Sequence, residues 1–77
     1  MNSEVKFTIK QARKFRELTQ RQVAEKMAID VSTYGKYEKK PQAMSYEQGE
    51  LFSKIVNLPI DMIIFFNDDS TLSREIA

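Results

Sequence analysis

The 77-residue chain has no cysteine, histidine or tryptophan, and only two glycines and two prolines. Without cysteine there is no disulfide scaffold, thiol nucleophile or cysteine-ligated zinc, and the composition fits a reducing compartment. Without histidine, the chain lacks the general base of Ser-His triads and the commonest transition-metal ligand. We therefore expect a cytoplasmic protein that is not an enzyme and has no metal site, no cofactor and no small-molecule substrate.

Long hydrophobic runs are also missing. The longest, Ile60–Phe66, is interrupted by Asp61, whereas a helix needs about 20 apolar residues to cross a bilayer. The first residues, Met1–Phe7, include an acidic side chain and no apolar stretch of the kind found in secretory signals. The sequence therefore predicts no contact with a membrane.

The overall charge is small, but it is unevenly distributed. Lys and Arg number 12 and Asp and Glu number 11, which gives a net charge of +1. Residues 1–40 carry a charge of +5, and residues 41–77 carry −4. Such asymmetry between halves is one of the few global features that indicate contact with nucleic acid. We expect Lys10, Lys36, Lys39 and Lys40 to cluster on one face.

Capping residues and apolar spacing predict short helices joined by turns. Thr8 and Ser45 each begin a capping box, and Thr19 and Asp30 are suitable N-caps. The helices are expected at about residues 9–18, 20–27, 31–39 and 46–56, with a fifth from Pro59 onward. The first of them should direct Ile9, Ala12 and Phe15 inward. No segment alternates with period two over a useful length, so no sheet is expected. Residues 8–66 form the domain, between tails at 1–7 and 67–77.

The segment Thr19–Glu38 consists of two short predicted helices separated by a turn around Ala28 and Ile29. Ala24 lies midway along the first of them. Two helices that cross steeply over such a short turn need a small residue where their backbones approach most closely. The spacing therefore predicts a helix-turn-helix unit, whose second helix can enter a major groove of DNA.

The same segment resembles the Cro and phage-repressor type of helix-turn-helix, also called the XRE family. The resemblance covers about residues 8–66 and implies an all-α, five-helix, lambda-repressor-like fold, double-stranded DNA as partner and a homodimer. We expect a sequence-specific transcriptional regulator of the phage or prophage repressor kind, associated with the nucleoid. The matching motifs are Arg13 seven positions before Gln20, Leu18-Thr19-Gln20, Val23–Met27, Ser32-Thr33-Tyr34, Lys36-Tyr37-Glu38 and Phe52–Asp61.

The resemblance implies a phosphate contact where the second helix begins. Gln20 and the nearby amides are expected to hold a DNA phosphate, because a helix N-terminus binds anions well. Thr19 is expected to cap the helix and also to lie near the phosphate. Arg21 is either a further phosphate contact or a solvated side chain.

The third predicted helix, at about residues 31–39, is the recognition helix. Positions i, i+1, i+4 and i+5 share one side of a helix, so Val31, Ser32, Gly35 and Lys36 are expected to face outward. There Val31 would pack on a thymine methyl, Ser32 would bond a base edge, and Lys36 would reach guanine or a phosphate. The alternative is an ordinary solvated helix face.

Several residues of this region have two interpretations. Gly35 either lets the helix sit deeper in the groove or is tolerated by packing, at a cost of about 1 kcal/mol relative to alanine. Thr33 bonds either a phosphate or a carbonyl of its own helix. Lys39 and Lys40 are either phosphate clamps, as their place in the family's fold suggests, or a solvated pair.

Other residues are expected to be structural. Arg13 and Glu38 match an ion pair of the family that ties the first helix to the recognition helix. Tyr34 and Tyr37 are expected in the core, with a phosphate contact by the Tyr34 phenol as the alternative. Where the family usually has glycine, Ala28 must either adopt a left-handed conformation at about 1 kcal/mol or change the turn.

Two other functions use the same fold. The chain could be the antitoxin of a toxin–antitoxin pair, or a protein-interaction module that has lost DNA binding and has a protein partner instead. The apolar cluster Met62–Phe66 is either core or, with Leu72 and Ile76, part of a twofold dimer interface.

Overall fold

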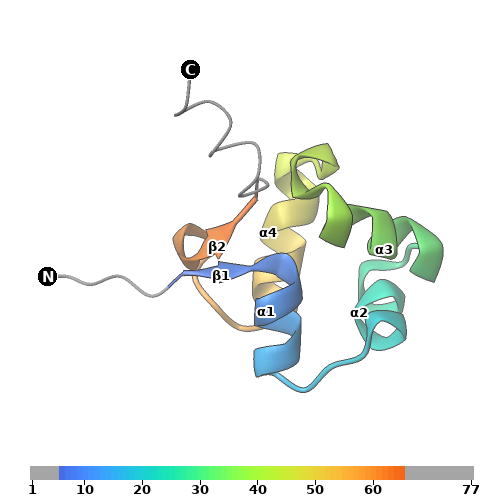
Figure 1. Ribbon diagram of the computed structural model, residues 1–77, viewed down its shortest axis with the longest axis horizontal. Coiled ribbons are helices and arrows are strands. Elements are labelled where there is room, and N and C mark those ends of the chain that lie inside the picture. The colour runs from blue at the N-terminus through green and yellow to red at the C-terminus, as the bar shows by residue number, and fades with distance from the viewer. Residues whose placement is uncertain (1–5, 66–77) are drawn as a thin grey trace, which may run out of the picture.

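The structure is a computed structural model, and it describes residues 6–65. Four α-helices make up most of this region (Figure 1). A two-stranded sheet and two short 3-10 helices, η1 and η2, complete it. In chain order the elements are β1 (Phe7–Thr8), α1 (Ile9–Phe15), α2 (Gln20–Met27), α3 (Val31–Lys39), η1 (Pro41–Ala43), α4 (Tyr46–Ile55), η2 (Ile60–Met62) and β2 (Ile63–Ile64).

The four α-helices begin where the sequence predicts, because local side chains bind the backbone at each N-terminus. Thr8, Thr19 and Ser45 each accept the N–H of the residue three positions later, at 3.0–3.1 Å. In all three cases the glutamine at that later position bonds back to the N-cap N–H, so each capping box is complete. Asp30 caps α3 by accepting the Ser32 N–H.

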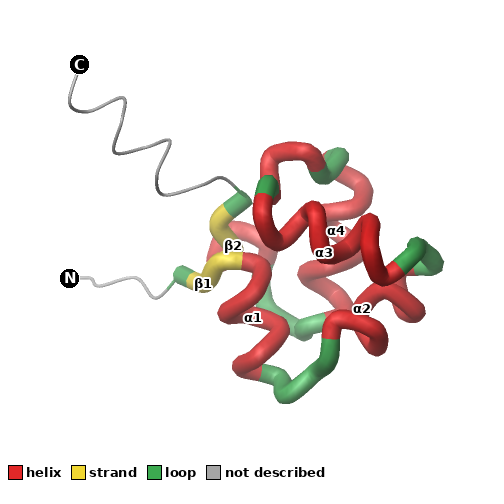
Figure 2. Tube along the Cα trace, turned by 45° about the vertical axis from the view of Figure 1, so that its right-hand side comes forward, coloured by secondary structure: helices red, strands yellow, loops and turns green. Residues whose placement is uncertain are grey.

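The expectation of no sheet is wrong. β1 and β2 pair in parallel, with Phe7 opposite Ile63 and Thr8 opposite Ile64. Strands of two residues are too short to show an alternating pattern, so periodicity could not indicate them. Figures 1 and 2 show this sheet at one side of the domain and α2 at the other.

The expectation of five helices is also wrong for the described residues. From Pro59 the chain forms only the single 3-10 turn of η2, in which the Met62 N–H donates to the Pro59 carbonyl at 2.9 Å. It then extends into β2, because the β-branched Ile63 and Ile64 suit a strand and can pair with β1.

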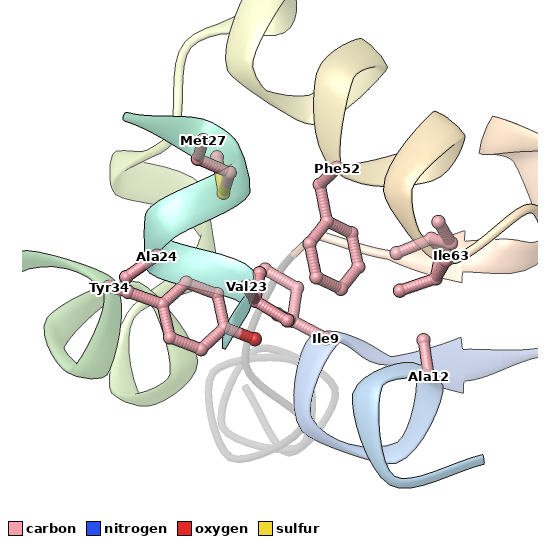
Figure 3. Packing of buried hydrophobic residues seen from close by; sticks show 9 residues of the cluster. Ile9, Ala12, Val23, Ala24, Met27, Tyr34, Phe52 and Ile63 are labelled. Atoms are coloured by element: carbon pink, nitrogen blue, oxygen red, sulfur yellow. The ribbon is translucent and has the colours of Figure 1, made fainter. Parts of the chain in front are cut away.

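The core lies where the helices meet the sheet (Figure 3). The Tyr34 and Phe52 rings stack within it, with centroids 6.3 Å apart. Phe15, predicted to point inward, is instead 55% exposed and packs on Phe7 at the surface, and Leu51 is also exposed. The buried apolar residues are Ile9, Ala12, Val23, Ala24, Met27, Tyr34, Phe52, Val56 and Ile63.

Left-handed residues follow three of the α-helices: Glu17 after α1, Ala28 after α2 and Asn57 after α4. Ala28 has φ 60° and ψ 41°, so the turn after α2 keeps the left-handed geometry at the cost of about 1 kcal/mol expected for a residue other than glycine. The Ile29 N–H then donates to the Ala24 carbonyl at 3.0 Å and closes the helix. Glu17, with φ 59°, likewise follows α1, which therefore ends at Phe15 rather than near Leu18.

Candidate nucleic-acid interface

α2 and α3 pack against each other across the turn at Ala28–Asp30. Ala24 is 1% exposed, and Figure 3 shows it beside the Tyr34 ring of α3. A larger side chain at Ala24 would enter the space of that ring. The requirement for a small residue at the contact of a helix-turn-helix is therefore met in the position that the sequence indicated.

α3 has a buried side and an exposed side. Tyr34 is fully buried, whereas Ser32, Lys36 and Lys39 are exposed. Val31 was expected to face outward with Ser32, but it is half-buried and packs against the core. Only part of its surface is left for a partner. Four further residues of the helix are partly exposed: Thr33, Gly35, Tyr37 and Glu38.

The hydroxyl of Ser32 is engaged by the helix cap. It donates to the Asp30 carboxylate, which also accepts the Ser32 N–H at 3.2 Å. These two bonds from Ser32 lower the pKa of Asp30, so the carboxylate is ionised at neutral pH. The Ser32 oxygen can still accept a hydrogen bond, which suits the amino groups of cytosine or adenine in the major groove.

The side chain of Gln20 is held within the protein. Its Nε2 donates to Glu38 Oε1 at 2.9 Å, a contact that sequence reasoning missed because no local pattern pairs residues 18 positions apart. The backbone N–H groups of Gln20 and Arg21 lie in the first turn of α2, where a helix supplies no acceptor. A phosphate at this helix end would therefore meet mainly backbone N–H groups, with Thr19 already capping Gln22.

Arg13 and Glu38, the predicted ion pair, join α1 to α3. Arg13 Nε lies 2.6 Å from Glu38 Oε2, and the two side chains are only 10% and 6% exposed. The Arg13 guanidinium also donates to the Leu18 carbonyl at 2.9 Å and to Glu38 Oε1 at 3.3 Å. Together with Gln20, the pair fixes the start of α2 against the end of α3.

The ionisation of this cluster reflects its contacts. Burial of the Glu38 carboxylate opposes its ionisation, but the hydrogen bonds from Arg13 and Gln20 outweigh that effect and hold the pKa of Glu38 below its usual value. The bond to Glu38 raises the pKa of Arg13. Both groups are therefore charged at neutral pH, and their charges compensate each other.

Tyr34 is a core residue and not a phosphate contact. The side chain is completely buried, and its hydroxyl has no well-formed hydrogen bond within residues 6–65 although it lies near Arg13 and Glu38. Burial, followed by the nearby Glu38 carboxylate, raises the pKa of Tyr34, so the phenol stays neutral. The alternative of a DNA contact by this phenol is therefore wrong.

The lysines near the end of α3 extend its exposed side. Lys36, Lys39 and Lys40 are exposed, and the Lys40 N–H caps the helix through the Lys36 carbonyl at 2.8 Å. The next residue, Pro41, is buried and directs the chain into η1. Lys10 is exposed on α1, and its clustering with the other three lysines stays a prediction.

The described part of the chain contains no group of three or more acidic side chains that could hold a metal ion. An apolar groove of about 280 Å³ lies at the start of α4. It is lined by Met44, Ser45, Tyr46, Gly49, Ile60 and Phe65. Phe66, Leu72 and Ile76, which were considered for a dimer interface, lie outside the described residues.

A comparison with known proteins identifies the family of the chain. Residues 9–63 match the helix-turn-helix family, a span that runs from the first residue of α1 to the first residue of β2. Neither a curated protein nor a solved structure matches the chain. Within residues 6–65, no helix combines the length and hydrophobicity that a transmembrane segment needs. The chain belongs to the XRE/Cro-type helix-turn-helix family of DNA-binding domains.

Proposed function

We propose that the protein is a sequence-specific regulator of transcription, of the phage or prophage repressor type, that places α3 in the major groove of double-stranded DNA. The observation that carries the proposal is the exposed basic side of α3. Lys36, Lys39 and Lys40 are exposed there, while Tyr34 anchors the opposite side in the core. A helix whose buried side is anchored in the core and whose exposed side is basic meets the requirements of a recognition helix.

The proposed contacts are of two kinds: contacts to DNA phosphates, called grip below, and contacts to base edges, called readout. At the start of α2, Thr19 and the backbone N–H groups of Gln20 and Arg21 would hold one phosphate. Lys39 and Lys40 would hold the next stretch of backbone beyond α3. Readout of base edges would come from α3. The Arg13–Glu38 pair would hold the residues that contact phosphate and those that contact bases in a fixed position relative to each other.

Within α3, Ser32 and Lys36 have chemistry suited to base readout. The Ser32 oxygen would accept from an amino group, because its proton is used at Asp30. The Lys36 ammonium would donate to guanine O6 or N7. Val31 and Thr33 would contribute only at the margin, since both are half-buried.

A single recognition helix reads only a few base pairs, so we include the homodimer in the proposal. Two copies would place their α3 helices in successive major grooves, roughly 34 Å apart, over a pseudo-palindromic site. The apolar groove at the start of α4 supports a contact between copies, because the adjoining Tyr46 is 71% exposed. Sedimentation equilibrium of the wild-type chain and of Tyr46→Arg tests this part, and a monomeric wild-type chain at micromolar concentration contradicts it.

The direct test begins with selection of tightly bound duplexes from a random double-stranded pool. The affinity for the selected duplex is then measured by fluorescence anisotropy at two salt concentrations, against a shuffled duplex of the same composition. We expect a strong preference for the selected duplex and a marked loss of affinity at the higher salt. Lys54→Ala, which removes an exposed lysine of α4, is the matched control and should bind as the wild type does.

Equal affinity for selected and shuffled duplexes would contradict sequence-specific regulation. If no duplex binds at low salt while a protein partner co-purifies, the protein-interaction module becomes the better reading. Co-purification of a neighbouring nuclease-like protein together with DNA binding would instead favour the antitoxin.

A further inference from the structure

Gly35 lies in the interior of α3, but nothing in the described domain requires a glycine there. A Cβ built on Gly35 would have no atom within 4 Å. Its φ angle is not positive, so the backbone conformation is open to any L-residue. Neither packing nor backbone geometry therefore offsets the helix propensity that a glycine loses.

The other glycine behaves differently. A Cβ on Gly49, in α4, would lie 3.3 Å from two ring carbons of Phe65, so glycine there makes room for a packed aromatic ring. The fold thus explains one of its two helical glycines and leaves the other without an internal reason. The reason for Gly35 must be sought outside the domain.

Gly35 is partly exposed, and a Cβ on it would point into open space. Ser32 precedes it by three positions and Lys39 follows it by four, so all three lie on one side of the helix. Lys36 is its exposed neighbour in sequence. If α3 enters the major groove, as proposed above, the missing side chain lets the helix axis approach the base pairs closely at this position.

The chemistry of a glycine limits what it can contact. Its N–H and carbonyl belong to the helix hydrogen-bond ladder, so the group it presents outward is the Cα with its two hydrogens. Such a surface favours an apolar neighbour that needs close approach. Among the base edges in the major groove, the apolar group is the 5-methyl of thymine.

We propose that Gly35 is the point of closest approach between α3 and DNA, where a thymine methyl occupies the space that a Cβ would fill. This inference rests on the proposed function and adds a specificity determinant to it. It assigns recognition of an A·T pair to the absence of a side chain rather than to a polar group.

The first test separates stability from binding. Gly35→Ala should raise Tm by roughly 4–8 °C, because alanine favours the helix. The same change should weaken binding to the selected duplex by at least about tenfold, because the added methyl meets the base pair. Ala28→Gly makes the opposite exchange at the left-handed turn residue and should also raise Tm, but should leave the affinity within about twofold.

The second test changes the DNA instead of the protein, by removing the thymine methyl. Each thymine of the selected duplex is replaced in turn by deoxyuridine. One such replacement in each half-site should weaken wild-type binding by about fourfold, the effect of burying one methyl group. It should have no effect on Gly35→Ala, whose own methyl already prevents the contact.

The inference is overturned if Gly35→Ala binds the selected duplex as tightly as the wild type. It is also overturned if every deoxyuridine has the same effect on both proteins. If instead the wild-type chain prefers no duplex at all, the proposed function fails, and this inference fails with it.

Discussion

α3 and α4 are neighbouring helices of similar length, but they are constrained from different directions. α4 is shaped from within the domain, since Phe65 covers Gly49 and Phe52 fills the core. α3 is anchored by Tyr34 on one side, while its other side carries Gly35 and exposed lysines with no packing requirement. Residues that the fold explains and residues that only a partner would explain are thus found on adjacent helices.

The largest effect should come from breaking the contact that holds α3 in place. Arg13→Met leaves the Glu38 carboxylate buried without its partner, and we expect a loss of about 3 kcal/mol in the free energy of unfolding. Urea denaturation measures it. Arg13→Met with Glu38→Gln should recover much of the loss, because the second change removes the uncompensated charge. Equal instability of the single and double variants would contradict this.

A smaller effect of the same pair should appear on acidification. The pKa of Glu38 is lower in the folded protein than in the unfolded chain, so its ionised form contributes stability that is complete above about pH 4.5. That contribution declines as the pH falls below 4.5 and through the folded-state pKa. The difference in urea midpoint between wild type and Glu38→Gln should therefore shrink as the pH is lowered. A difference that is constant from pH 7 to pH 3 would contradict it.

On the exposed side of α3, two lysines should differ in the kind of effect rather than in stability. Lys36→Ala should cost about 2 kcal/mol at one base pair and relax the preference there. Lys40→Ala should weaken binding to every sequence alike and reduce the salt slope by about one. Anisotropy titrations with single-base variants of the selected duplex distinguish them. Identical behaviour of the two variants would show that readout and grip are wrongly assigned.

The smallest effect sharpens the contrast between the two glycines. Gly49→Ala gains helix propensity but forces the Phe65 ring to move, so we expect a net loss of about 1 kcal/mol in the free energy of unfolding. Gly35→Ala should gain about as much. Thermal unfolding of both variants side by side measures the difference. If Gly49→Ala were more stable than the wild type, packing against Phe65 would not require glycine in α4, and the contrast with α3 would fail.

The sequence was most informative where structure is decided locally. Thr8, Thr19, Asp30 and Ser45 act as caps within two or three residues of themselves, and so the starts of all four α-helices could be predicted. The pairing of Phe7 with Ile63 could not, because it depends on two short segments from opposite ends of the domain meeting in space.

The candidate site shows the same limit. The position of α3 was predictable from the caps and the spacing of the helices, and the Arg13–Glu38 pair was implied by the resemblance to the family. The burial of Val31 and the bond from Gln20 to Glu38 were not, since helix periodicity gives a face but tertiary packing decides how much of it stays exposed. Phe15 is the clearest case. Its place on the apolar stripe of α1 predicted burial, but the side chain lies at the surface beside Phe7.

The parallel pairing of β1 with β2 has a consequence for how the domain folds. Each helix can form from hydrogen bonds between residues close in sequence. Residues 7 and 63, by contrast, can pair only after most of the chain between them has folded. The sheet should then be the last part to form and the first to open. Backbone amide exchange at Ile64 should accordingly be fast beside that of α2, which would mean that the sheet opens independently of α2 and α3.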